Sequence, residues 1–271
     1  MEQRTLLELA IRPWVQLFTT LAFAAVAGAT SGAQGAPEAI VAGDRAYALL
    51  DAAGALASYE RAAAADTLSY EAAWKASRSA ADLERPSRGS ASHAALLVRA
   101  ESHARRAVAL RPNGAEGHFA LARALGVAAR SRGTRDRVRY AGDVRNHALE
   151  CLRHDPGHSG CLHIMGAWNA EVMRLSGVER FVARRLLGGR AFGRASWSEA
   201  IRYMEAAVAA APRRIVHRVE LAEIYAERGR AADAKRQYEA ALTLSIDDFN
   251  DEFYKAGARR ALERMNSTTE P

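Results

Sequence analysis

A spacing of small and apolar residues recurs five times along this 271-residue chain and limits the folds open to it. Steps of four, three and five residues separate the members of each set, and the last member ends the pattern. Steps of three and four place side chains on one face of an α-helix, and proline cannot continue a helix. The pattern therefore predicts five amphipathic helices that each end in a turn. The sets are Ala55-Tyr59-Ala62-Thr67, Ala100-Ala104-Ala107-Pro112, Val144-Ala148-Cys151-Pro156, Ala200-Met204-Ala207-Pro212 and Ala234-Tyr238-Ala241-Ile246.

The distances between the five terminators indicate a repeat. They are 45, 44, 56 and 34 residues, and the last equals the period of the tetratricopeptide repeat (TPR). A partner helix precedes each set, most clearly at Leu221, Ala222 and Tyr225. Small residues let two antiparallel helices approach closely, but one hairpin cannot bury its apolar face alone, so neighbours must stack. We therefore predict an all-α, TPR-like α-solenoid of about five helical hairpins over residues 34–246.

The segments outside the hairpins have their own patterns. Residues 85–95 predict a polar loop and residues 131–143 a basic loop. The insertion at residues 173–197 differs, because its "VERFVARRLL" is amphipathic and flanked by glycines, which predicts a short independent helix. Residues 247–265 predict a C-terminal capping helix with a polar outer face, and residues 266–271 a disordered tail. The insertion helix carries Arg180, Arg184 and Arg185 opposite Phe181. Packing on the solenoid, a plug across the groove, docking on a partner and peripheral contact with an anionic membrane all remain open.

The N-terminus is typical of an export signal. Arg4 and Arg12 accompany an uncharged apolar stretch over residues 14–29, and small residues follow it. We predict a signal peptide over residues 1–33 and a periplasmic or secreted protein, with an inner-membrane anchor at residues 14–29 as the alternative. The formal net charge of +7 favours acidic partners or an anionic surface, but export argues against a nucleic-acid partner.

The second half of the chain resembles a known family. Gly166-Ala167-Trp168 fits a Gly-x-Trp motif, and Leu175-Ser176, Glu179 and the run from Ala183 to Gly188 fit its insertion. Residues 248–255 fit its final helix. From Tyr140 to Leu262 the sequence thus resembles the regulator of microtubule dynamics family, a group of TPR-like proteins. The resemblance implies the solenoid fold and, from the eukaryotic members, links to microtubules and a role as an N-terminally anchored membrane tether.

The sequence has none of the common enzyme signatures. It contains no Gly-x-Ser-x-Gly, no phosphate-binding Gly-Lys-Ser/Thr loop and no His-Glu-x-x-His, so we predict no catalysis and no cofactor. Cys151, His154, His158, Cys161 and His163 have side chains that suit zinc. Cys151 fills a small-residue position of its helix, however, so we predict no metal. A Cys151–Cys161 disulfide and two buried free thiols both remain open.

The first helix of each hairpin lines the concave side of a TPR superhelix. Helical position therefore predicts the groove residues, and such a groove usually binds a peptide or another protein. We predict a non-catalytic scaffold that holds a protein or peptide ligand there. The sequence does not indicate which partner it binds or its oligomeric state. The predicted groove residues are Lys75, Phe119, Arg123, His163, Glu171, Glu223 and Glu227.

Overall fold

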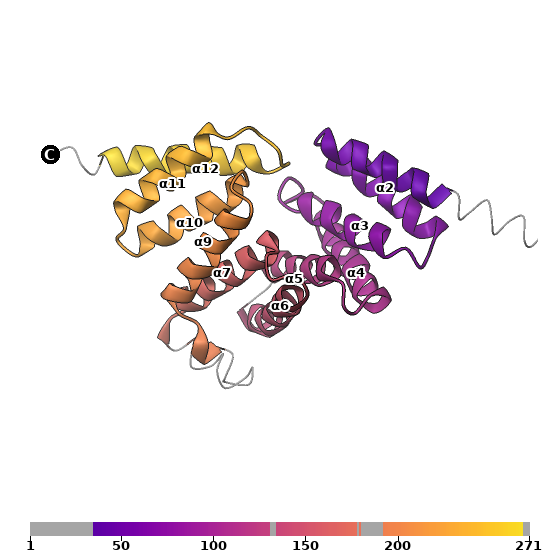
Figure 1. Ribbon diagram of the computed structural model, residues 1–271, viewed down its shortest axis with the longest axis horizontal. Helices are drawn as coiled ribbons and strands as arrows, with labels where there is room; N and C mark the ends of the chain where they lie inside the picture. Colours follow the sequence, from indigo (N-terminus) through magenta and orange to yellow (C-terminus); the bar gives the residue numbers. More distant parts are fainter. Residues whose placement is uncertain (1–34, 131–133, 178, 180–191, 268–271) are drawn as a thin grey trace, which may run out of the picture.

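Successive pairs of helices build the molecule (Figure 1). The computed structural model describes residues 35–130, 134–177, 179 and 192–267, and the regular structure in these ranges is helical throughout. A last helix, α12 (Asp251–Ser267), packs on α10 and α11. The predicted all-α solenoid of five hairpins and a C-terminal helix is confirmed. The pairs are 35–48 with α2 (Ala52–Ala65), α3 (Tyr70–Asp82) with α4 (His93–Leu110), α5 (Ala115–Arg130) with α6 (Thr134–His154), α7 (Ser159–Arg174) with α9 (Trp197–Ala210), and α10 (Ile215–Glu227) with α11 (Ala231–Thr243).

Small side chains let the two helices of each hairpin pack closely. The first three positions of all five sets are buried, and none of them is more than 8% exposed. Helices α7 and α9 approach each other closely at Gly166. A Cβ atom there would lie 3.0 Å from Met204 Cε and 3.2 Å from the Ala200 carbonyl oxygen. Glycine at this position therefore allows the two helices to touch.

The helices end where the terminators predict. Helices α4, α6 and α9 each stop two residues before a proline, at Pro112, Pro156 and Pro212, because the residue before proline is driven out of the helical conformation. Serine caps start several of the next helices. Ser69 Oγ accepts a hydrogen bond from the Ala72 N–H (3.2 Å), and Ser196 Oγ accepts one from the Glu199 N–H (3.1 Å).

Two large apolar cores run through the solenoid, and α7 belongs to both. The first core extends from α2 to α7 and includes Trp168, while the second extends from α7 to α12 and includes Leu162 and Ala170. Trp168 Nε1 also donates a hydrogen bond to the Ala141 carbonyl oxygen (2.8 Å). Helix α7 therefore joins the N-terminal and C-terminal hairpins.

The predicted basic loop over residues 131–143 is wrong for most of its length. Helix α6 already begins at Thr134, so the segment after residue 133 lengthens the second helix of its hairpin. Tyr140 is only 7% exposed and packs in the first core with Val144. Burial of these apolar side chains stabilises a helical turn that charge alone did not indicate. The polar loop over 85–95 is non-helical until α4 begins at His93.

The insertion begins with a helix-starting contact. The Ser176 N–H donates to Glu179 Oε2 (2.9 Å), and the Glu179 N–H donates to Ser176 Oγ (3.2 Å). This reciprocal pair is a capping box. Arg180, Phe181, Arg184 and Arg185 lie outside the described residues, as does the predicted signal peptide over 1–33. None of the helices described has the length and apolar character that a membrane span requires.

Candidate functional site

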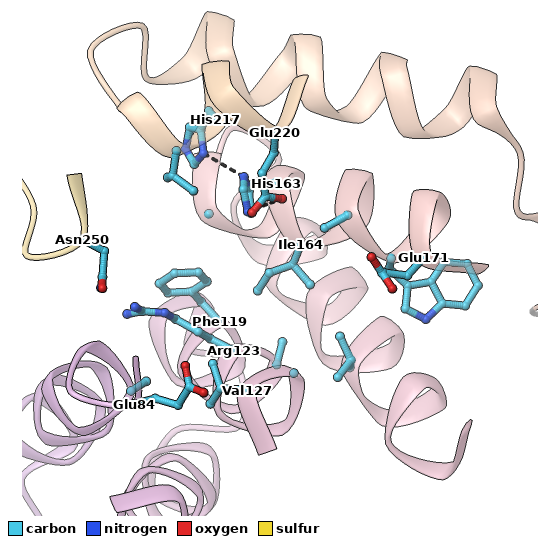
Figure 2. A pocket seen from close by; sticks show the side chains of 18 of the residues that line it. Glu84, Phe119, Arg123, Val127, His163, Ile164, Glu171, His217, Glu220 and Asn250 are labelled. Carbon is cyan, nitrogen blue, oxygen red and sulfur yellow. Dashed lines mark hydrogen bonds and ion pairs between the residues drawn. The ribbon is translucent and has the colours of Figure 1, made fainter. Parts of the chain in front are cut away.

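A cavity of about 1440 Å³ lies on the concave side of the solenoid. Helices α3, α5, α7 and α10 supply most of its lining, so the first helices of four hairpins wall it as predicted (Figure 2). Aromatic, charged and polar side chains line these walls together with small apolar ones. The lining includes Tyr47, Glu84, Arg85, Arg88, Glu116, Phe119, Arg123, Gly126, His158, His163, Glu171, Arg174, Arg214, His217, Glu220, Glu223, Asp248, Asn250 and Tyr254.

The two ends of the solenoid meet beside this cavity. The rings of Tyr47 and Phe249 contact edge to face with centroids 4.8 Å apart. The Arg85 guanidinium lies 3.8 Å from the centroid of the Phe253 ring, and Asn250 Nδ2 donates to a carbonyl oxygen at the end of α3 (3.5 Å). The expected open groove is therefore bridged, because these contacts close the solenoid beside the cavity. In the ribbon the first and last hairpins approach each other (Figure 1).

Arg123 braces the wall between α3 and α5. Its Nη2 lies 2.5 Å from Oδ1 of Asp82, whose side chain is fully buried. Burial raises the pKa of the Asp82 carboxyl, the Arg123 guanidinium opposes that shift, and the nearby Asp248 adds to it. Because its charge is committed to a buried carboxylate, Arg123 stabilises the wall and leaves little of its charge for a ligand.

Three polar side chains of α7 and α10 lie in a row (Figure 2). His163 Nε2 lies 3.3 Å from Glu220 Oε2, and the negative charge of the carboxylate favours the tautomer of His163 that carries its proton on Nε2. His163 Nδ1 then accepts from His217 Nδ1–H (3.0 Å). This order leaves the lone pair of His217 on Nε2. Burial, helped by His163 and then Arg214, lowers the pKa of His217 well below its usual value, so the ring is neutral.

Six carboxylates line the cavity, and five are paired within the protein. The exception in the described part of the chain is Glu223, which has no hydrogen bond or ion pair. Partial burial beside the cavity wall, followed by the charge of Glu220, raises its pKa to about 7, although the side chain is exposed to solvent. The five pairs are Glu84–Arg88 (2.8 Å), Glu116–His158 (3.5 Å), Glu171–Arg174 (2.5 Å), Glu220–His163 (3.3 Å) and Asp248–Arg214 (2.9 Å).

The structure brings five of the seven predicted groove residues to the cavity, namely Phe119, Arg123, His163, Glu171 and Glu223. Lys75 is not among the lining residues. It is 9% exposed, and its Nζ pairs with Asp44 (2.7 Å) and Glu71 (2.6 Å). Glu227 lies beside the cavity and pairs with Arg174 (2.6 Å), which does line it.

Sequence reasoning missed the lining residues that come from the ends and the turns. Tyr47, Arg85 and Asn250 reach the cavity only because the solenoid closes. His217 could have been found, because it lies on α10, the first helix of its hairpin, one step of three residues before Glu220. A search for polar residues at steps of three along each first helix would have identified it.

Cys151 and Cys161 form a disulfide that links the end of α6 to the first turn of α7, with Cα atoms 6.4 Å apart. This decides between the two alternatives that the sequence left open. His158 caps α7 in the same turn, where its Nδ1 accepts from the Cys161 N–H (3.2 Å). The two sulfurs and a His158 nitrogen lie within 4.8 Å of one another. Because the sulfurs are bonded to each other, they are not thiolate ligands in this structure.

Known structures share this architecture. The crystal structure of a thermophilic TPR protein from Thermus thermophilus superposes with a TM-score of 0.59 at 22% identity, covering 82% of this chain and 98% of that one. MamA from Desulfovibrio magneticus RS-1 gives a TM-score of 0.44 at 13% identity, with coverage of 78% and 94%. The first likeness establishes the TPR-like fold. No curated protein sequence matches this chain. A family model described as regulator of microtubule dynamics protein 1-3 matches residues 42–266.

Proposed function

This chain belongs to the regulator of microtubule dynamics family, and from that membership and its cavity we propose that it is a scaffold which holds a peptide or protein segment. The cavity volume of about 1440 Å³ carries this proposal, because small-molecule pockets usually enclose about 300–1,000 Å³. A TPR-like solenoid also presents an extended concave surface suited to a chain segment.

The arrangement of charges supports binding rather than catalysis. Arg123 is paired with Asp82, His163 with Glu220, and Arg174 with Glu171 and Glu227. Such pairs fix the cavity walls in place before a ligand arrives, which lowers the ordering cost of binding. The scaffold we propose is therefore non-catalytic and pre-organised.

We further propose that the protein works outside the cytoplasm. The Cys151–Cys161 disulfide supports this location, because disulfides persist in oxidising compartments and are rare in the cytosol. Sequencing the N-terminus of the mature protein tests the proposal. A start near Gln34 supports a released protein, whereas retention of residues 14–29 supports the membrane tether that the family resemblance implies.

A blocked cavity tests the binding role. Gly126 lies on α5 at the cavity wall, and a Cβ atom there would meet nothing within 4 Å. We expect Gly126→Trp to place an indole at the cavity wall and to abolish capture of the saturable partner that wild-type protein takes from an envelope extract. Gly142→Trp is the matched control, since Gly142 is helical, equally open and outside the lining. Equal capture by both variants would show that the partner binds elsewhere.

A further inference from the structure

Helix α10 presents two polar groups to the cavity whose bonding capacity is unused by the rest of the described chain. They are the Glu223 carboxylate and His217 Nε2. They flank Glu220 at steps of three residues, so each lies about 60° around the helix from it and they lie about 120° from each other. The other carboxylates that line the cavity are paired. Among the described residues of α10 that line it, the Glu223 carboxylate and His217 Nε2 are therefore the polar groups without a protein partner.

Glu223 is suited to a cationic group. It is the one described lining carboxylate without an ionic partner, and Glu220, one turn away, adds negative charge. Arg174, the cation that most lowers the pKa of Glu223, is held by Glu171 (2.5 Å) and Glu227 (2.6 Å). A ligand cation at Glu223 would therefore complete an ion pair that the protein itself leaves unmade.

His217 supplies an independent anchor. The residue is only 4% exposed and lines the cavity, and among the described residues its single hydrogen bond joins Nδ1 to His163. With its proton on Nδ1, the ring carries an acceptor at Nε2, and none of the described residues donates to it. A ligand N–H can donate to this nitrogen.

We propose that α10 binds an extended peptide through a lysine or arginine side chain at Glu223 and a peptide N–H at His217 Nε2. This inference rests on the proposed cavity function and specifies its ligand. Six residues of helix separate the two anchors by about 9 Å along the axis and about 120° around it, so an extended chain needs at least about three residues to span them. The cationic residue thus lies at least about three positions from the anchored N–H.

The overall charge makes this selectivity local. The chain carries a formal net charge of +7, which repels a basic peptide at long range. The attraction of a basic peptide must therefore come from α10 itself, and it should depend on the Glu223 carboxylate. Replacing an acidic residue elsewhere on the surface by a neutral one should leave the affinity unchanged.

Binding at Glu223 should also depend on pH. A cation binds the ionised carboxylate, and with a pKa of about 7 the ionised fraction rises about tenfold between pH 6 and pH 8. Removal of Glu223 should therefore flatten the pH dependence, whatever the neighbouring groups contribute. The charged and titratable groups around Glu223 are Glu220, Glu227 and His217 on α10, His163, Glu171 and Arg174 on α7, Arg85 after α3, Tyr238 on α11, and Tyr254, Arg260 and Arg264 on α12.

The test uses an acetylated, amidated hexapeptide with one lysine among alanines and its norleucine counterpart. The readout is the carbon-13 shift of the Glu223 carboxyl, assigned by its absence in Glu223→Gln. We expect the lysine peptide to bind at least tenfold more tightly than the norleucine peptide at pH 8, and about tenfold more weakly at pH 6. The Glu223→Gln variant is followed through its backbone amide shifts. Its affinity for the lysine peptide should match the affinity of the wild-type protein for the norleucine peptide. Glu252→Gln, an exposed charge-matched change outside the cavity lining, should keep wild-type affinity.

Two outcomes would overturn the inference: equal affinities for the two peptides, or no saturable shift of the Glu223 carboxyl up to the solubility limit of the lysine peptide. Either result leaves the proposed function standing if Gly126→Trp still abolishes partner capture. Conversely, lysine-specific binding at Glu223 with unchanged capture by Gly126→Trp would reject the scaffold site while keeping the cation subsite.

Discussion

Reduction of the Cys151–Cys161 disulfide should destabilise the protein by a calculable amount. The crosslink spans ten residues of sequence, and the chain-entropy relation for a loop of that length gives about 2.7 kcal/mol at 25 °C. Reduction is a cleaner perturbation than serine substitution. Both sulfurs are fully buried, and a free thiol packs there as a small apolar group, whereas a serine would bury a hydroxyl.

Urea unfolding measures this effect. Oxidised protein and protein refolded under a thiol reductant are compared by far-ultraviolet circular dichroism. With a slope of about 2–3 kcal/mol per molar urea, the midpoint should fall by about 1 M. If residual structure in the turn between α6 and α7 already restrains the unfolded chain, the midpoint should fall by less than this. Coincident midpoints at equal slopes would refute the assumption that the crosslink acts by restricting the unfolded state.

Three further perturbations test the packing and the buried charges. Gly166→Val should cost about 1–3 kcal/mol in urea unfolding, because its side chain would enter the space of Met204; unchanged stability would mean that α7 and α9 can separate. Arg123→Met should cost about 3–5 kcal/mol by the same assay, because Asp82 would stay buried without its partner; a loss below about 1 kcal/mol would contradict the brace. Burial lowers the folded-state pKa of His217, whereas the unfolded chain takes up a proton near pH 6.5. Stability should therefore fall as the pH drops below about 6.5 and level off below the folded-state pKa. His217→Phe should reduce this slope in thermal unfolding at several pH values, and an unchanged slope would assign it to other groups.

The candidate site was predictable where it depends on helix periodicity. Phe119, His163 and Glu223 face the cavity because each lies on the inward face of a first helix. Lys75 occupies a comparable position, but Asp44 and Glu71 take its charge. Asp44 belongs to the helix over residues 35–48, whose weak repeat pattern gave no indication of that contact. The position of a residue on a helix face therefore predicts which way its side chain points. It predicts less well which partner a charged side chain pairs with.

The sequence by itself determined which side chains pack between paired helices and where those helices stop. These properties depend on residues three to five positions apart and on proline, so local chemistry is sufficient. Only the tertiary structure decided that the ends of the solenoid meet and that Glu223 stays unpaired. Asn250 reaches the end of α3 across 168 residues of sequence, and that contact depends on the summed packing angles of all the hairpins. No local spacing encodes such a sum, because each angle is set by how whole helix faces fit together.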